Sequence, residues 1–150
     1  MQTTLAVREK AAQLLAADSS TLAPAALANK MVLIQNVFTA SENSALADLT
    51  LANFDGSTPL DCGLGTQPEG LDPNTNDAVI SLKTPAGGWR WETTGVTNLP
   101  QTIHGYALLD NALALVLALE RLPTPITLTA INQMVNLGQA SIIQLAGSMR

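Results

Sequence analysis

The chain has 150 residues, of which 13% are charged and 47% are hydrophobic, and its formal net charge is −5. This length suits one domain that buries roughly two-thirds of its unfolded surface without disulfide staples. The seven basic residues are scattered along the chain. Nucleic acid and anionic membranes are therefore excluded as main partners, because phosphate binding requires clustered Lys and Arg. Because so few residues are charged, we expect the surface of the protein to associate with other subunits.

No apolar run approaches the ~18–20 residues of a membrane span. Arg8, Glu9 and Lys10 also interrupt the position where a signal peptide would have its apolar core. We therefore expect a protein that is made and kept in a cytosol, or in a particle assembled there. Cys62 is the single cysteine, which excludes an internal disulfide.

Residues 4–18 are predicted to form an amphipathic helix, because apolar side chains recur at helical spacing after Thr4, a suitable N-cap. Pro24 favours the first turn of a second short helix. We expect a helical arm over 1–29 and a β domain over 30–150. The arm packs either on its own sheet or on a neighbouring subunit. Its candidate partner-binding residues are Leu5, Val7, Leu14 and Leu15.

The stretch 101–120 is predicted to form the central hairpin of an antiparallel sheet. Asp110 and Asn111 tolerate the backbone of a tight turn. After them, leucines at 113, 115, 117 and 119 alternate with smaller apolar residues, and a period of two is typical of a strand. Leu and Ala favour helix by propensity, so a helix is the alternative interpretation. In the hairpin, the leucine face is expected to point inward.

Further strands are predicted where apolar and β-branched residues lie between turn signals. These strands are 30–38, 60–64, 78–84, 89–93, 126–131 and 139–146. Pro123 and Pro125 are expected to bracket a turn, Thr50 to cap a short helical turn, and Asp55–Gly56 to form a turn. The segment 57–77 reads as a long irregular loop. The sequence thus predicts a mainly β fold, an antiparallel β-sandwich of about seven short strands with an N-terminal helical arm.

No combination of residues predicts catalysis. His104 lies in the middle of a predicted strand and is expected to be satisfied by one hydrogen bond, without a nucleophile and carboxylate beside it. Cys62 is interpreted as a small loop residue. The run 72–77 resembles a calcium loop, but Lys83 stands where a bidentate glutamate is required, so an Asx-rich turn is the better interpretation. No phosphate-binding glycine loop is present in the sequence. We expect no enzyme activity, no metal and no cofactor.

Trp89 and Trp91 lie two residues apart, on the same face of their strand, with Arg90 on the other. Such a pair either fills the core, anchors a protein interface, or stacks on a sugar ring. Both tryptophans are therefore retained as candidate partner-binding residues.

The segment 30–56, KMVLIQNVFTASENSALADLTLANFDG, carries two motifs, and a third follows later in the chain. The motifs are Leu46-Ala47-Asp48-Leu49-Thr50, Phe54-Asp55-Gly56 and Ile103-His104-Gly105-Tyr106 leading to Asp110. In this order the chain resembles, over about 30–146, a group of small structural proteins from tailed bacteriophages. It departs from that group at Ser57, where tyrosine is frequent, and at 51–53, where the group is more acidic. The resemblance implies a β-sandwich component of the virion, on the capsid or the tail, with no catalytic residues.

These observations together predict a non-enzymatic virion protein assembled in the host cytoplasm. Its expected role is that of a capsid decoration or cement protein, a small homo-oligomer that binds the major capsid protein or other virion proteins and stabilises the head. One alternative is a head–tail or tail-fibre adaptor. An alternative of another class is a carbohydrate-binding module for host attachment.

Overall fold

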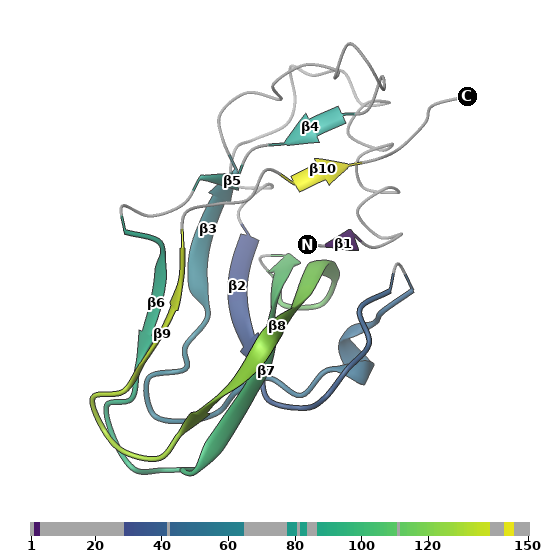
Figure 1. Cartoon of the computed structure of the whole chain (residues 1–150). Coiled ribbons are helices and arrows are strands. Elements are labelled where there is room, and N and C mark those ends of the chain that lie inside the picture. The colour runs from purple at the N-terminus through teal and green to yellow at the C-terminus, as the bar shows by residue number, and fades with distance from the viewer. Residues whose placement is uncertain are drawn as a thin grey trace.

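The computed structural model describes residues 2–3, 29–41, 43–64, 78–80, 82–83, 87–110, 112–138 and 143–145 (Figure 1). Over these residues the chain is mainly β, and every described strand pair is antiparallel. The predicted helices at 4–18 and 24–29 and the Asx-rich run 72–77 lie outside the described residues, apart from Asn29. Asn29 begins a strand, so the expected boundary between arm and β domain falls one residue inside the sheet.

The largest sheet has six strands in the order β1-β8-β7-β2-β3-β5. Their bounds are β1 Gln2–Thr3, β2 Asn29–Ile34, β3 Leu60–Leu64, β5 Leu82–Lys83, β7 Gln101–Asp110 and β8 Val116–Leu128. β7 is central and pairs with β2 on one side and β8 on the other, which confirms the predicted strand at 101–110. β4 (Ala78–Ile80) and β10 (Ile143–Leu145) form a separate pair. The predicted strands at 60–64, 78–84 and 139–146 are therefore confirmed where their residues are described.

Both faces of the central sheet are buried. Along β2, Met31 and Leu33 contribute to one apolar cluster, and Val32 and Ile34 to the other. The first cluster includes side chains of β6 (Trp89–Glu92) and β9 (Met134–Leu137), which pair with each other. The second is closed by the segment 38–51, which contains the 3-10 turn η2 (Leu46–Asp48). Figure 1 shows the β6–β9 pair on one side of the sheet and η2 on the other.

The turn between β7 and β8 is wider than the predicted two-residue turn. β8 begins only at Val116, because the Asp110 carboxylate accepts hydrogen bonds from the backbone N–H groups of Ala114 and Leu115, at 2.7 and 2.9 Å. Leu115 is therefore exposed in the turn, whereas Val116 and Ala118 are as buried as Leu117 and Leu119. The expectation of one inward leucine face is thus wrong, since the sheet is covered on both sides here.

β8 also continues past Pro123 and Pro125, where a turn was expected. The pairing with β7 passes from Gly105↔Arg121 to Ile103↔Ile126, so His104 alone opposes the four residues 122–125. These four residues bulge out of the ladder. Proline, which has no N–H to donate, is tolerated there because no ladder hydrogen bond requires one. The expected strand at 126–131 is therefore the end of β8.

Two local predictions also change. β2 ends at Ile34 and not at residue 38, because Gln35 and Asn36 hydrogen-bond to the segment 48–51. The helical turn precedes Thr50, since Asp48 closes η2 by accepting from the Ala45 N–H at 3.0 Å. β9 was not predicted at all. The Asp55–Gly56 turn is confirmed, with Gly56 at a φ of 103°.

Candidate interaction surface

The groups that could carry chemistry are dispersed or buried in the described residues. None of the described His, Cys, Asp and Glu side chains form a group of three or more able to hold a metal ion. Within the same part of the chain, no helix is long and apolar enough to cross a membrane. His104 is half-buried, and its buried Nδ1 has no hydrogen-bond partner.

Cys62 lies in β3 and is fully buried in the first apolar cluster, so its interpretation as a loop residue is wrong. Burial raises the pKa of the Cys62 thiol to about 12, because a thiolate would lose its hydration. Burial and the 2.6 Å hydrogen bond to Glu120 likewise raise the pKa of the Tyr106 phenol above its ordinary value. Both groups stay protonated at neutral pH and serve packing.

The thiol gives a prediction for alkaline stability. Since folding raises its pKa, the unfolded chain loses the proton first, and the free energy of unfolding falls as pH rises above ~8.5. Between pH 8 and pH 10 we expect the free energy of unfolding of the wild type to fall by about 2 kcal/mol more than that of a Cys62→Ala variant. Urea denaturation of both proteins at the two pH values measures this difference. If the free energy of unfolding falls equally in both proteins, the Cys62 thiol is not buried as described.

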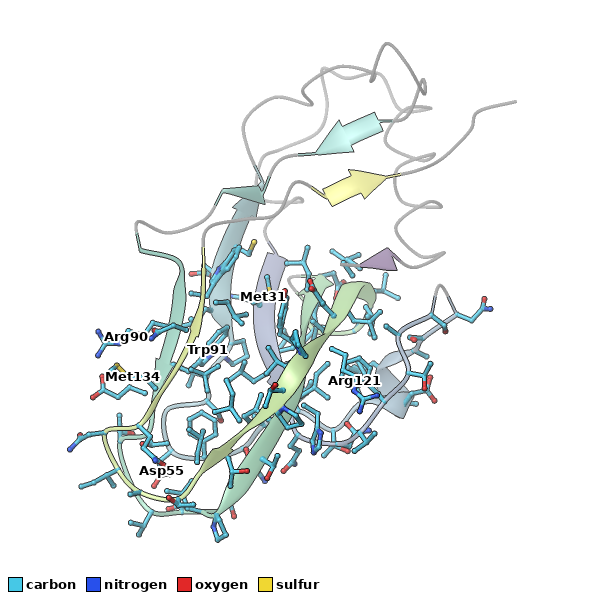
Figure 2. All side chains as sticks on the ribbon, viewed as in Figure 1. Met31, Asp55, Arg90, Trp91, Arg121 and Met134 are labelled. Atoms are coloured by element: carbon cyan, nitrogen blue, oxygen red, sulfur yellow. The ribbon has the colours of Figure 1, made fainter. Side chains whose placement is uncertain are left out.

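Trp89 and Trp91 are placed in the core. They are 4% and 1% exposed, and the Trp91 Nε1 donates to the Thr58 carbonyl at 3.0 Å. Figure 2 shows Trp91 directed inward from β6 and Arg90 directed outward, where it pairs with Glu92 at 2.8 Å. Of the three interpretations of this pair, the structure places the indoles as core filling, and they present no face to a sugar or a protein. The other candidates, Leu5, Val7, Leu14 and Leu15, lie outside the described residues.

A different surface emerges where three loops meet at one end of the molecule, which we call the loop end. Its segments are 53–58, 93–100 and 129–133, the lower loops in Figure 1. Thr93 is fully buried and joins two of them: its Oγ1 donates to the Ala130 carbonyl at 2.7 Å and accepts from the Gln133 N–H at 2.9 Å. The backbone of Thr93 adds two more bonds, from its own N–H to the Gln133 carbonyl and from the Asn132 N–H to its carbonyl.

The loop 53–58 is joined to the loop 93–100 by further hydrogen bonds. Asn53 and Gln101 exchange two hydrogen bonds of 3.1 and 2.6 Å, and Asn98 donates to the Asn53 carbonyl at 2.7 Å. Asp55 accepts from the backbone N–H groups of Thr94 and Thr97 through its carbonyl and its carboxylate. Asn98 and Asn132 adopt a left-handed backbone, which asparagine tolerates better than most residues. The loop end is therefore held in one conformation by internal hydrogen bonds.

Replacing Thr93 tests this rigidity. Thr93→Val keeps the shape of the side chain but leaves the Ala130 carbonyl and the Gln133 N–H without a partner inside the fold. We expect the free energy of unfolding to fall by about 1–3 kcal/mol, the net contribution of two hydrogen bonds. Chemical denaturation gives the value, and Thr94→Val, at an exposed neighbour, serves as the matched control. A loss equal to that of the control would mean that Thr93 does not hold the loops together.

The loop end and the adjoining half of β8 carry almost no charge. Residues 93–109 and 122–149 contain no Asp, Glu, Lys or Arg, and Asp55 is the only charged residue in the three loops. We call the exposed residues of 94–100 and 123–132 the uncharged surface. The half-buried Asp55 lies beside it, and its carboxylate accepts from the Thr97 N–H. The uncharged surface consists of Thr94, Val96, Thr97, Asn98, Pro100, Pro123, Thr124, Pro125, Thr127, Thr129, Ala130, Ile131 and Asn132.

Two large apolar side chains stand out on the uncharged surface. Val96 is 73% exposed and Ile131 is 50% exposed, and the hydrogen bonds of Thr93 link the loops that carry them. Met134, at 45%, pairs with Glu92 from β9 and faces outward in Figure 2. Charged groups border the surface at Arg121 on β8 and at the Arg90–Glu92 pair on β6. Soluble protein surfaces ordinarily intersperse charges of both signs, so a neutral region with exposed Val and Ile is typical of an interface.

The sequence held a signal for this surface, namely the two long runs without charge. It could not show that the two runs fold to the same end of the molecule, because that depends on pairings between β6 and β9 and between β7 and β8. No family model, curated protein or solved structure matches the chain. The described residues define a mainly β chain with a face that is poor in charge and ordered by internal hydrogen bonds.

Proposed function

We propose that this chain is a non-enzymatic structural protein of a tailed-bacteriophage virion, and that it decorates and stabilises the assembled head. The uncharged surface carries the proposal, because a rigid neutral face is suited to burial in an assembly and offers no chemistry of its own. The resemblance of the motifs to those of small phage structural proteins indicates that this assembly is a virion. The major capsid protein or another virion protein would be the partner, and the virion the place where the chain acts.

Several of the residues behind the resemblance serve the fold. Leu49 and Phe54 are buried, Asp55–Gly56 makes a turn, and Gly105 lies where a Cβ would meet the ring of Phe38. A chain that shares these motifs would share this packing. We infer that the two layers joined by the first cluster, the central sheet and the β6–β9 pair, make a β-sandwich.

Stabilisation would follow from mass action. A protein that binds the assembled head, and not the separated capsid subunits, opposes dissociation in proportion to its occupancy. Because the loop end is already ordered by its own hydrogen bonds, binding through it costs little conformational entropy. This favours a structural role over one that requires a moving loop.

The arm 1–29 remains the proposed capsid-docking element, through Leu5, Val7, Leu14 and Leu15. Because Asn29 pairs within β2, the truncation that tests the arm should begin at Asn29. It also removes β1, which pairs with Leu119 and Ala118 of β8. We expect the truncated chain to fold, by circular dichroism, and to fail to join particles. A truncated chain that is unfolded would assign the arm to the core of its own subunit.

Counting copies tests the function itself. Quantitative mass spectrometry of purified particles compares this chain with the major capsid protein. A decoration protein should be present in hundreds of copies, whereas a head–tail or tail-fibre adaptor occurs in about a dozen or fewer, as expected for a ring at one vertex. Absence from particles would refute the structural role. A carbohydrate-binding module is not favoured by any observation, since both indoles are buried.

A further inference from the structure

We propose that β1 is exchanged between neighbouring copies of this chain when they are packed together, so that β1 of one copy pairs with β8 of the next. In the structure β1 extends the central sheet beyond β8, with Gln2 opposite Leu119 and Thr3 opposite Ala118. The inference deepens the proposed function by naming the partner of the first part of the arm. It rests on that function only for the claim that the exchange takes place on a particle.

The part of β8 that β1 covers is an apolar sheet edge. Residues 116–119 are all buried, and their side chains contribute to both apolar clusters. They include no proline and no charged residue, and an edge without such guards readily pairs with another strand. Farther along β8, Arg121 adds a charge, and Pro123 and Pro125 lack an N–H. The first part of β8 is therefore the part that accepts a strand.

The connection between β1 and β2 is long enough to reach a second copy. The chain leaves β1 after Thr3 and enters β2 at Asn29, both at the end of the sheet where the β7–β8 turn lies (Figure 1). Only β8 and β7 separate β1 from β2, so the two points are about 14 Å apart at the usual strand spacing. A segment as long as 4–28 spans up to about 80 Å when extended. It is far longer than pairing within one copy requires.

The exchange costs no strand pairing, so concentration decides where β1 lies. Each copy gives one β1 and receives one, and the same residues pair as in the single chain, which makes such swapping a low-cost route to oligomers. The connecting segment holds β1 beside its own β8 at an effective concentration on the order of 1 mM or below. We therefore expect β1 to stay on its own copy in dilute solution and to be exchanged where copies are crowded to that concentration.

Engineered disulfides distinguish the two arrangements. In a Cys62→Ala background, Thr3→Cys and Ala118→Cys together place two thiols at opposed positions. Opposed Cα atoms of an antiparallel pair lie about 4.5–5.5 Å apart, which a disulfide spans. After oxidation, a bridge within one chain keeps the 15.7 kDa mass on a non-reducing gel, and a bridge between chains gives a multiple of it. We expect the interchain share to rise from a few per cent at roughly 10 µM chain to about a half or more at about 1 mM.

The matched control combines Thr3→Cys with Thr124→Cys, since Thr124 is exposed on the same strand but is not a partner of β1. It should give little interchain product. If circular dichroism shows that the Ala118 variant is unfolded, the second opposed pair, Gln2→Cys with Leu119→Cys, provides the same measurement.

Three results would overturn the inference: a bridge that stays within one chain at both concentrations, no bridge in either opposed pair, or as much interchain product in the control. Each of these would leave the copy number on particles unaffected. Conversely, an interchain bridge together with absence of the chain from particles would refute the proposed function alone.

Discussion

Trp91→Ala should lower the free energy of unfolding by about 4 kcal/mol, the range observed when a large aromatic core residue is truncated. Trp91 is 1% exposed and joins the β6–β9 pair to Met31 and Leu33 of the central sheet through the first apolar cluster. Alanine removes the ring, leaves a cavity between the two layers, and loses the hydrogen bond from Nε1 to the Thr58 carbonyl. Guanidinium denaturation measures the loss.

The control for Trp91→Ala is Trp91→Phe, which retains an aromatic ring but has no N–H. We expect it to cost about 1–3 kcal/mol, for the smaller ring and an unpaired Thr58 carbonyl. A cost below 1 kcal/mol for the alanine variant would contradict the packing of the β6–β9 pair on the sheet. It would then follow that the two layers do not share a core.

Gly88→Ala should be at least as damaging, because two effects add. Gly88 has a φ of 85°, which an L side chain rarely adopts, and a Cβ there would collide with the backbone carbonyl of Leu137 in β9. The collision cannot be relieved by rotating a side chain, so β6 and β9 must separate. We expect a loss of about 3–5 kcal/mol, or no folded protein.

The adjacent glycine provides a matched control for this prediction. Gly87 has nearly the same backbone angle, a φ of 90°, but no atom lies within 4 Å of a Cβ placed there. Gly87→Ala should therefore report the backbone strain alone, about 1 kcal/mol. If thermal denaturation shows equal losses for the two variants, Gly88 does not lie against β9 as described.

The strands that follow from local pattern were predictable, and the ones that depend on distant pairing were not. β7 was predicted with its bounds because polar and apolar residues alternate and a turn pair follows. β9 was missed, although Val135 and Leu137 alternate with exposed residues, because four residues are too few to stand out. Its place is determined by pairing with β6, some forty residues earlier in the chain.

The prolines of β8 show how a correct local rule can give a wrong result. Pro123 and Pro125 do break the hydrogen-bond ladder, as their chemistry requires. The chain nevertheless keeps its direction, since pairing with β7 resumes at Ile126. Whether a break becomes a turn or a bulge depends on the partner strand, which a single stretch of sequence does not show.

The candidate site was predicted less well than the fold. Tryptophan is common both in cores and at interfaces, and a two-residue spacing cannot separate the two when the covering layer is unknown. Burial places Trp89 and Trp91 in the core. Val96 and Ile131 gave no local signal, because each lies in a polar loop, and only the fold reveals that the two loops form one surface.

The most direct test of the uncharged surface as a buried interface is hydroxyl-radical footprinting, read by mass spectrometry. The oxidation rates of Val96 and Ile131 are compared between dilute chain and purified particles, with Val37 as the internal reference. We expect both rates to fall in particles while that of Val37 falls less. If Val96 and Ile131 react equally fast in the two states, the uncharged surface faces solvent in the assembly, and it is not an interface.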